Sequence, residues 1–285
     1  MLWEELRQDE FSAAVEKSSK VCVLPIGCVE AHAIHLPLGC DVMHVMHHCI
    51  LASEMEPIVI FPPIYFGEKS GAGEYPGTII FPESLIMKIL DACCEEIHRN
   101  GFDKILIVNG HGGNPDMLKT FICSTLDRKR GYIVYLYSAS LAASHPSKIL
   151  ESAEDFPYLT DSDKAILEGY VSGEHRDGHG GFIETGWIYA ARPELTRLDL
   201  MNVYDGRTTG VWSEFSAREI YTPFGWMANF PHSLSCTPYE GLNERIANAM
   251  AELSAKKLAN VFCFLKRETT SVEFYKAWEK KNPTL

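Results

Sequence analysis

The residues best suited to chemistry are carboxylates and histidines in two short polar segments. Glu30 and His32 lie two residues apart, so in an extended loop their side chains point the same way. Asp41 follows at the start of a helix-like stretch, and His111 lies in the glycine-rich segment 109–114. Carboxylates and neutral imidazoles are ligands for Zn, Mn or Fe, and an aspartate can bridge two such ions. The four residues together predict a two-metal hydrolytic site.

Each of these residues also has a plain alternative when it is taken alone. Glu30 can be a surface acid, Asp41 a helix cap and His111 a loop histidine. A third polar segment raises the same choice, because His179 and Glu184 can face one crevice, yet Glu184 also suits a first helical turn. Three further histidines within a helical pattern are expected in core, cap or surface positions rather than as ligands: His44, His47 and His48.

Alternating strand and helix patterns must position these segments. Short apolar runs predict four strands, at residues 21–26, 58–61, 105–108 and 133–137. Helix-period apolar residues lie between them, and Asn114, Pro115 and Asp116 supply an N-cap, a first-position proline and a first-turn acid. The order predicts an α/β fold with right-handed βαβ units and a mostly parallel β-sheet flanked by helices. Functional side chains in such sheets gather at the carboxyl ends of the strands.

The rest of the chain is less regular. Residues 138–181 show no clear strand and are expected to form a long excursion near the site. Apolar spacing over residues 246–265 predicts a long amphipathic helix. The aromatic-rich segment 212–230 is either an oligomer contact or a cover over the core. We find no repeat and no linker, so we expect residues 1–285 to form a single domain.

Composition excludes several classes of protein. The 26 Lys and Arg residues against 38 Asp and Glu residues give a net charge of −12, which argues against nucleic-acid and anionic membrane surfaces as partners. The sequence contains neither an apolar run of about 18 residues nor a signal-peptide pattern. Nine cysteines without CxxC spacing indicate reduced thiols rather than a disulfide scaffold. We therefore expect a cytoplasmic protein.

The three polar segments resemble the motifs of the creatininase (creatinine amidohydrolase) family. Residues 24–41, LPIGCVEAHAIHLPLGCD, are similar to the first motif of the family, LPxGxxEQHGxHLPLxxD. Residues 69–78 look like its substrate loop ending in FPGT, residues 109–114 match its NGHGGN form, and residues 179–185 match its HxGxxET form. The match keeps the order and spacing of the motifs from about residue 20 to about residue 195.

This resemblance implies a creatininase-like fold, a homo-oligomer that is usually a hexamer, and hydrolysis of a C–N amide bond. It also implies two divalent metal ions, Zn and/or Mn or Fe. By motif position, Glu30 and His111 would bind one ion, His32 the other, and Asp41 would bridge both. His179 falls on the catalytic histidine of the family, and Ser70 on a serine that contacts substrate.

Departures from the creatinine-hydrolysing members bear on the second ion and on the substrate. Gly112 and Gly113 stand where those enzymes carry Tyr and a metal-binding Glu, and we nominate Glu184 as the replacement ligand. His175 and Arg176 replace a Trp–Asp pair that closes over creatinine. These changes argue against creatinine and leave a cyclic amide, a formamide or a peptide-like amide as the substrate class.

The mechanistic hypothesis is attack on an amide carbonyl by water that two metal ions activate. His179 would deliver a proton to the leaving nitrogen, the backbone near Gly112 would face the developing charge, and Arg176 would hold an anionic substrate group. An alternative is a metal-binding or scaffold member of the same fold with reduced catalysis. A nucleotide-binding loop at residues 109–114 is weaker, because the segment lacks the Gly-Lys-Ser/Thr ending.

Overall fold

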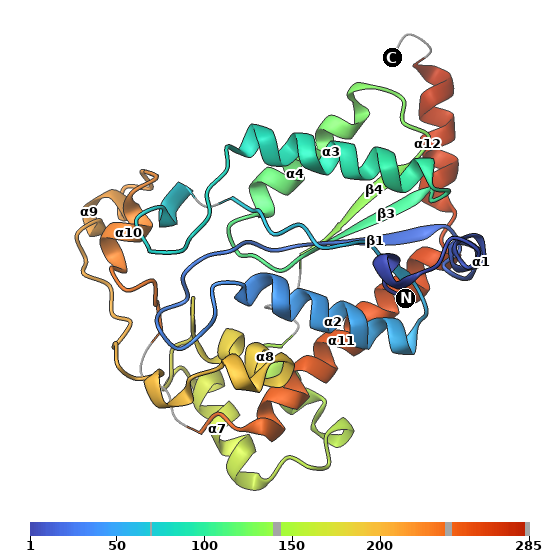
Figure 1. Ribbon diagram of the computed structural model, residues 1–285. Coiled ribbons are helices and arrows are strands. Elements are labelled where there is room, and N and C mark those ends of the chain that lie inside the picture. Colours follow the sequence, from blue (N-terminus) through green and yellow to red (C-terminus); the bar gives the residue numbers. More distant parts are fainter. Residues whose placement is uncertain (69, 139–143, 237–240, 283–285) are drawn as a thin grey trace.

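A computed structural model describes residues 1–68, 70–138, 144–236 and 241–282, and the description of Ser70 is confined to its backbone. A parallel sheet lies at the centre, with helices on both faces (Figure 1). The predicted α/β class is therefore confirmed. The strands are β1 (Val21–Ile26), β2 (Val59–Ile60), β3 (Lys104–Asn109) and β4 (Ile133–Tyr137). The principal helices are α1 (Phe11–Lys17), α2 (Cys40–Met55), α3 (Glu83–Arg99), α4 (Pro115–Ser124), α6 (Pro146–Glu151), α7 (Asp161–Ser172), α8 (Phe182–Ala191), α9 (Ser213–Ser216), α10 (Gly225–Asn229), α11 (Glu244–Arg267) and α12 (Thr270–Lys281), with a 3₁₀ turn, η2, at Ser70–Ala72.

The sheet has the strand order β2-β1-β3-β4. Every residue of β1 and β3 is buried, as expected for parallel strands covered on both faces. The register pairs Val21 with Lys104 and Ile26 with Asn109, so β1 and β3 end side by side. Gly110, directly after β3, donates its N–H to the carbonyl of Ile26 at 2.8 Å. The loops that follow these two strands therefore start next to each other.

Alternation along β1 divides its side chains between two cores. Leu24 and Ile26 pack with apolar residues of α3 and α4 on one face of the sheet. Val21 and Val23 pack with α2 and α11 on the other face, where Phe262 is fully buried. A third cluster joins α11 to α6, α7 and α8 below α2 in Figure 1. The long helix α11 thus links the sheet to the helices that carry the third polar segment.

Two segments differ in detail from the sequence pattern. The described part of residues 138–181, which we expected to form a long excursion, contains the helices α6 and α7, and α7 begins with a capping box between Thr160 and Asp163. Asn114 precedes α4, but its side chain makes no cap hydrogen bond to the helix. Its Oδ1 accepts from the N–H of Glu68 at 2.8 Å, and its Nδ2 donates to Asn109 at 3.0 Å. The Asn114 side chain ties loops together instead of capping.

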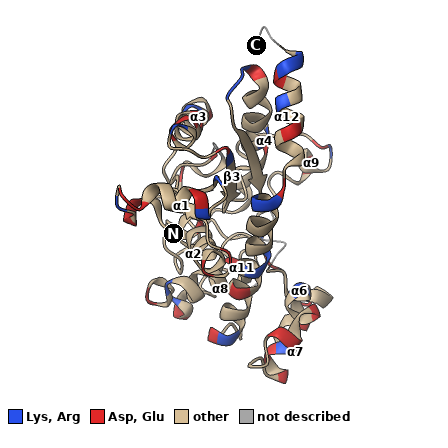
Figure 2. Ribbon diagram, turned by 90° about the vertical axis from the view of Figure 1, so that its right-hand side faces the viewer, with Lys and Arg blue, Asp and Glu red and all other residues tan. Residues whose placement is uncertain are grey.

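The remaining features concern the surface charges, the cysteines and the character of the helices. Acidic and basic residues both occur on outer helices such as α3 and α12 (Figure 2). All nine cysteines lie in the described part of the chain, and none of them forms a disulfide. Within the described ranges, we find no helix that combines the length and the apolar character required to cross a membrane.

Candidate metal centre

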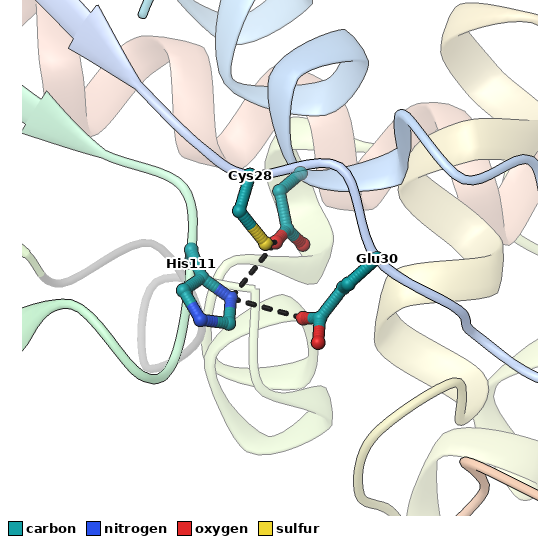
Figure 3. Close-up of side chains that lie close together, drawn as sticks. Cys28, Glu30 and His111 are labelled. Atoms are coloured by element: carbon teal, nitrogen blue, oxygen red, sulfur yellow. Dashed lines mark hydrogen bonds and ion pairs between the residues drawn. The ribbon is translucent and has the colours of Figure 1, made fainter. Parts of the chain in front are cut away.

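Side chains from the loops after β1 and β3 converge at the carboxyl ends of these two neighbouring strands. The Nδ1 atom of His111 lies 3.0 Å from Oε1 of Glu30, and both side chains are buried (Figure 3). The same Nδ1 atom lies 2.8 Å from Oδ2 of Asp41, which belongs to the first turn of α2. The convergence follows from the register of β1 and β3, which sets the two loops side by side.

The two oxygens of Asp41 face two different imidazoles. Oδ2 faces His111, whereas Oδ1 lies 3.3 Å from Nε2 of His32. His32 is fully buried, and its Nε2 atom lies among three carboxylates, 3.3 Å from Asp41, 3.6 Å from Glu184 and 3.9 Å from Glu30. A buried nitrogen of this kind beside a carboxylate suits a bound cation. Asp41 therefore lies where one carboxylate can serve two ions.

Both histidines have their far ring nitrogen against a backbone carbonyl. Nε2 of His111 lies 3.0 Å from the carbonyl of Glu68, and Nδ1 of His32 lies 3.2 Å from the carbonyl of Glu30. Because a carbonyl only accepts, these far nitrogens carry the hydrogen, and this assignment leaves the near nitrogens as bases. Metal-ligating histidines are commonly held in this way.

The buried carboxylates of the site need positive charge close to them. Burial alone would raise the pKa of Asp41, but His111 and His32 together hold it well below its usual value. Burial opposes protonation of His111, yet Glu30 and Asp41 raise its pKa to about 9. Without bound ions, protonated imidazoles balance the negative charge of the buried carboxylates. Divalent ions would supply this positive charge when they bind.

The third polar segment reaches the same place from α8. Glu184 lies in the first turn of α8, and its Oε2 lies 3.6 Å from Nε2 of His32 and accepts from the N–H of Gly180 at 2.6 Å. The ring of His179 stacks on that of His32 at 4.2 Å, with Nε2 2.9 Å from the carbonyl of Ala31. Nδ1 of His179 lies 4.0 Å from Oε1 of Glu30. His179 thus borders the carboxylates and the imidazole of His32.

The donor atoms fit divalent metal ions. Three overlapping groups each bring their donor atoms within 4.8 Å of one another: Cys28, Glu30, Asp41 and His111; Glu30, His32 and His179; His32, Cys40 and Asp41. Oxygen and nitrogen donors of this kind suit Zn, Mn or Fe. The thiol of Cys28 also contacts this cluster, because its Sγ atom donates a hydrogen bond to Oδ2 of Asp41 at 2.9 Å.

A cavity of about 420 Å³ opens onto these residues. Glu30, His111, His179 and Glu184 contribute to its wall together with Gly112. The volume is within the lower part of the range usual for small-molecule sites. The cavity therefore gives a small ligand access to the cluster.

Aromatic side chains close another part of the cavity. Trp226, on α10, lies edge-on to His179 with ring centroids 5.3 Å apart. Tyr221 also lines the cavity and is 85% exposed. Part of the aromatic-rich segment therefore covers the site, whereas Phe224 and Tyr221 keep large exposed surfaces.

The other predicted substrate residues are spread more widely. Gly112 lines the cavity, and a methyl group added there would meet nothing within 4 Å. His175 lines a neighbouring cavity, where its ring lies 5.1 Å from Tyr170. Arg176 is exposed and is not among the described residues that line the central cavity. Ser70 begins η2, and its side chain lies outside the described residues.

Several residues at the site had no assigned role in the sequence. Glu68 and Trp226 line the cavity, but neither belongs to a motif whose spacing indicates chemistry. Asp177 also lines the cavity, and its Oδ1 accepts from the N–H of Phe182 at 2.6 Å. Because the residue before α8 is Gly181, which has no side chain, Asp177 provides the cap. Asp is among the residue types that favour helix caps, but Asp177 precedes Phe182 by five residues, so its position in the sequence does not indicate the cap.

Comparisons with known proteins bear on the family and the fold of this chain. The family model described as Creatininase: Creatinine amidohydrolase matches residues 4–259. A creatinine amidohydrolase from Pseudomonas putida is 25% identical over 230 residues, which cover 77% of this chain and 82% of that protein. A creatininase variant of Zn-Zn type has a TM-score of 0.72 at 19% identity, covering 94% of this chain and 98% of that one. A putative creatinine amidohydrolase from Bacteroides fragilis has a TM-score of 0.67 at 21% identity, covering 87% and 90%. A creatininase described with Mn has a TM-score of 0.71 at 18% identity, covering 94% and 99%.

Proposed function

Since the chain belongs to the creatininase family, we propose that it is a hydrolase that cleaves a C–N amide bond with two divalent metal ions bound around Asp41. The observation that carries the proposal is the placement of the two Asp41 oxygens, 2.8 Å from His111 and 3.3 Å from His32. A carboxylate with one oxygen beside each of two histidines suits a centre in which two ions lie about 3.5–4 Å apart.

We assign the remaining ligands by proximity. Glu30 and His111 complete one ion site with Asp41, because their facing atoms are 3.0 Å apart. His32 and Glu184, 3.6 Å apart, complete the other. Glu184 thereby takes the place of the carboxylate that is lost at Gly113. We propose Zn, Mn or Fe as the metal, in keeping with the donor set and with the Zn-Zn and Mn forms of the similar structures.

The protein groups around the ions have distinct tasks. Ions at such a centre polarise a carbonyl and make water acidic enough to react near neutral pH. Nε2 of His179 faces the carbonyl of Ala31 and carries the hydrogen, so Nδ1, which is turned toward Glu30, would take a proton from the attacking water and deliver it to the leaving nitrogen. Burial and His32 lower the pKa of His179, so the ring is neutral at neutral pH and gives up readily any proton that it accepts from water. Gly112 leaves its backbone open toward the cavity.

The substrate proposed is a small amide of the cyclic, formamide or peptide-like class. The cavity of about 420 Å³ accommodates a small molecule, and Trp226 offers a flat apolar wall beside His179. Arg176 remains the proposed contact for an anionic substrate group and Ser70 a proposed substrate contact. We further propose a single domain, a homo-oligomer, hexameric by family resemblance, and a cytoplasmic location.

The alternative of a scaffold protein with reduced catalysis depended on the missing carboxylate at Gly113. The position of Glu184 beside His32 weighs against it, since both proposed ion sites then have three protein ligands. Three protein ligands leave a coordination position for water or substrate, as in catalytic sites.

The experiment is a hydrolysis screen of the metal-loaded protein against lactams, cyclic ureas and N-formyl compounds. We expect turnover of at least one of these amides, its loss after chelation, and its return when Zn²⁺ or Mn²⁺ is added. A protein that binds metal but hydrolyses none of these amides would favour the scaffold alternative.

A further inference from the structure

Two buried histidines on α2 have no part in the proposed reaction. His44 is fully buried and His48 is 3% exposed. Neither belongs to a group of potential metal ligands among the residues that the structure describes. Buried imidazoles that bind no ion need another reason to be there, because polar groups in a core cost free energy unless they are hydrogen-bonded.

His44 makes one hydrogen bond that bears on the metal centre. Its Nε2 atom lies 2.8 Å from the carbonyl oxygen of Gly110, so Nε2 carries the hydrogen and donates it. Gly110 directly precedes His111, and its own N–H donates to Ile26 at 2.8 Å. Both polar backbone groups of Gly110 therefore have fixed partners, one on β1 and one on α2.

Close packing adds to this constraint. A methyl group at Gly110 would lie 2.6 Å from the backbone oxygen of Asp41 and 2.7 Å from Cβ of Val45. The turn that carries His111 thus lies directly on the backbone of α2, and only glycine permits this approach. The hydrogen bond from His44 secures the turn at the point of closest contact.

The ring of His44 also contacts α8. It stacks on the indole of Trp187 with centroids 4.4 Å apart and planes inclined by 30°. Trp187 lies three residues after Glu184, and its Nε1 donates to Ser144 at 2.8 Å. A single imidazole therefore contacts the turn that carries His111 and the helix that carries Glu184.

His44 is suited to this place because it is neutral. Burial lowers its pKa to about 4, and its Nδ1 atom has no hydrogen-bond partner within the described part of the chain. A neutral ring adds no positive charge behind a site that receives cations.

We propose that His44 is a positioning residue for the metal centre, which holds His111 in the place that metal binding needs through its hydrogen bond to Gly110. The proposal rests on the proposed function, because it concerns the same ions. Removal of groups that hydrogen-bond a metal ligand directly typically changes metal affinity or activity by roughly 10–100-fold, and we take this range as the expectation for His44, which acts through the residue next to His111.

His48 provides the matched control. It lies on the same helix, is buried against the same Trp187 with ring centroids 5.3 Å apart, and has an Nε2 atom without a hydrogen-bond partner in the described ranges. His48→Phe therefore tests the loss of a buried imidazole against Trp187. His44→Phe keeps an aromatic ring but removes the donor to Gly110, and His44→Gln restores an N–H donor at a similar reach.

The test combines two measurements on the full chain. Hydrogen–deuterium exchange of the metal-free protein follows the turn at residues 109–114, and competition with a chromogenic chelator gives the affinity for Zn²⁺. For His44→Phe we expect exchange in this turn to be faster by roughly tenfold, as for a buried carbonyl left without its partner, and Zn²⁺ affinity to fall by roughly 10–100-fold. We expect His44→Gln and His48→Phe to stay near the native values in both measurements.

Each other outcome has a defined meaning. Native Zn²⁺ affinity in His44→Phe overturns the proposal, whether or not the turn exchanges faster. An equal loss of affinity in His48→Phe, or no rescue by His44→Gln, also overturns it, because the effect then belongs to core packing. If the native protein binds no Zn²⁺, Mn²⁺ or Fe²⁺ at all, the proposed function itself fails.

Discussion

The Nδ1 atom of His111 lies 2.8 Å from the Oδ2 atom of Asp41, although one residue follows β3 and the other opens α2. The contact exists because β1 and β3 are adjacent parallel strands whose ends are in register at Ile26 and Asn109. It places a base and a carboxylate in a buried site where other ligand-type side chains also point.

Glu184→Gln should remove one of two bound metal ions. The amide keeps the size of the side chain but replaces a charged ligand of the ion shared with His32. We expect metal content, measured by mass spectrometry, to fall from two equivalents to about one. Unchanged stoichiometry would show that Glu184 is only the first-turn helix acid.

His179→Gln should separate catalysis from metal binding. The variant loses the imidazole that exchanges protons beside Glu30, but it removes none of the five ligands that we assign. We expect kcat to fall by about 10²- to 10⁴-fold with the metal content unchanged. Loss of metal together with activity would instead make His179 a ligand.

Gly113→Ala and Gly112→Ala form a matched pair. A methyl group at Gly113 would lie 2.5 Å from Nε2 of His111 and 3.1 Å from the backbone oxygen of Glu68, whereas at Gly112 it would meet nothing within 4 Å. The first change must displace the hydrogen bond that orients His111. We expect Zn²⁺ affinity to fall by roughly tenfold or more in Gly113→Ala and to stay native in Gly112→Ala. Equal affinities in both variants would contradict this role for the hydrogen bond.

Asp163 should make the free energy of unfolding depend on pH in the acidic range. Its carboxylate accepts from Arg245 at 2.7 Å, from Thr160 at 2.8 Å and from Asn243 at 2.8 Å, so it joins the starts of α7 and α11. The hydrogen bonds from Arg245, with those from Thr160 and Asn243, hold the pKa of Asp163 well below its usual value. A depressed folded-state pKa gives stability that is present above the unfolded pKa of about 3.9 and is lost as the pH falls below it.

Asp163→Asn should therefore lower the free energy of unfolding by about 2 kcal/mol at pH 7 and less at pH 3. Urea unfolding at the two pH values measures the difference. Asp161→Asn is the control, because Asp161 lies in the same first turn but is fully exposed. An equal effect in both variants would mean that the shared helix dipole, and not the hydrogen-bond network, is responsible.

Local patterns predicted the elements that carry the motifs. The bounds of β1 and β4 agree with the structure, because short apolar runs between turn residues leave a clear pattern. The helix α7 was missed although Thr160 and Asp163 supply a capping box, since polar and glycine residues around it suggested a loop.

The site was predictable only in part. The sequence pattern predicted that polar residues after parallel strands gather at the carboxyl ends of those strands. The register of β1 and β3 does bring four of them together: Glu30, His32, Asp41 and His111. The place of Trp226 depends on how α10 packs against Gly71 in η2, a contact between distant segments that no spacing encodes. Hydrogen bonds of the far histidine nitrogens to backbone carbonyls likewise require the folded chain.

The most direct test of the central claim is the metal content of the native protein and of Asp41→Asn, measured by mass spectrometry after loading with Zn²⁺ or Mn²⁺. We expect two equivalents in the native chain and loss of both from Asp41→Asn, because its two oxygens face the two ion sites. The control is Asp161→Asn, which should retain both ions. A native chain that binds one ion or none, or an Asp41→Asn variant that retains two, would contradict the account.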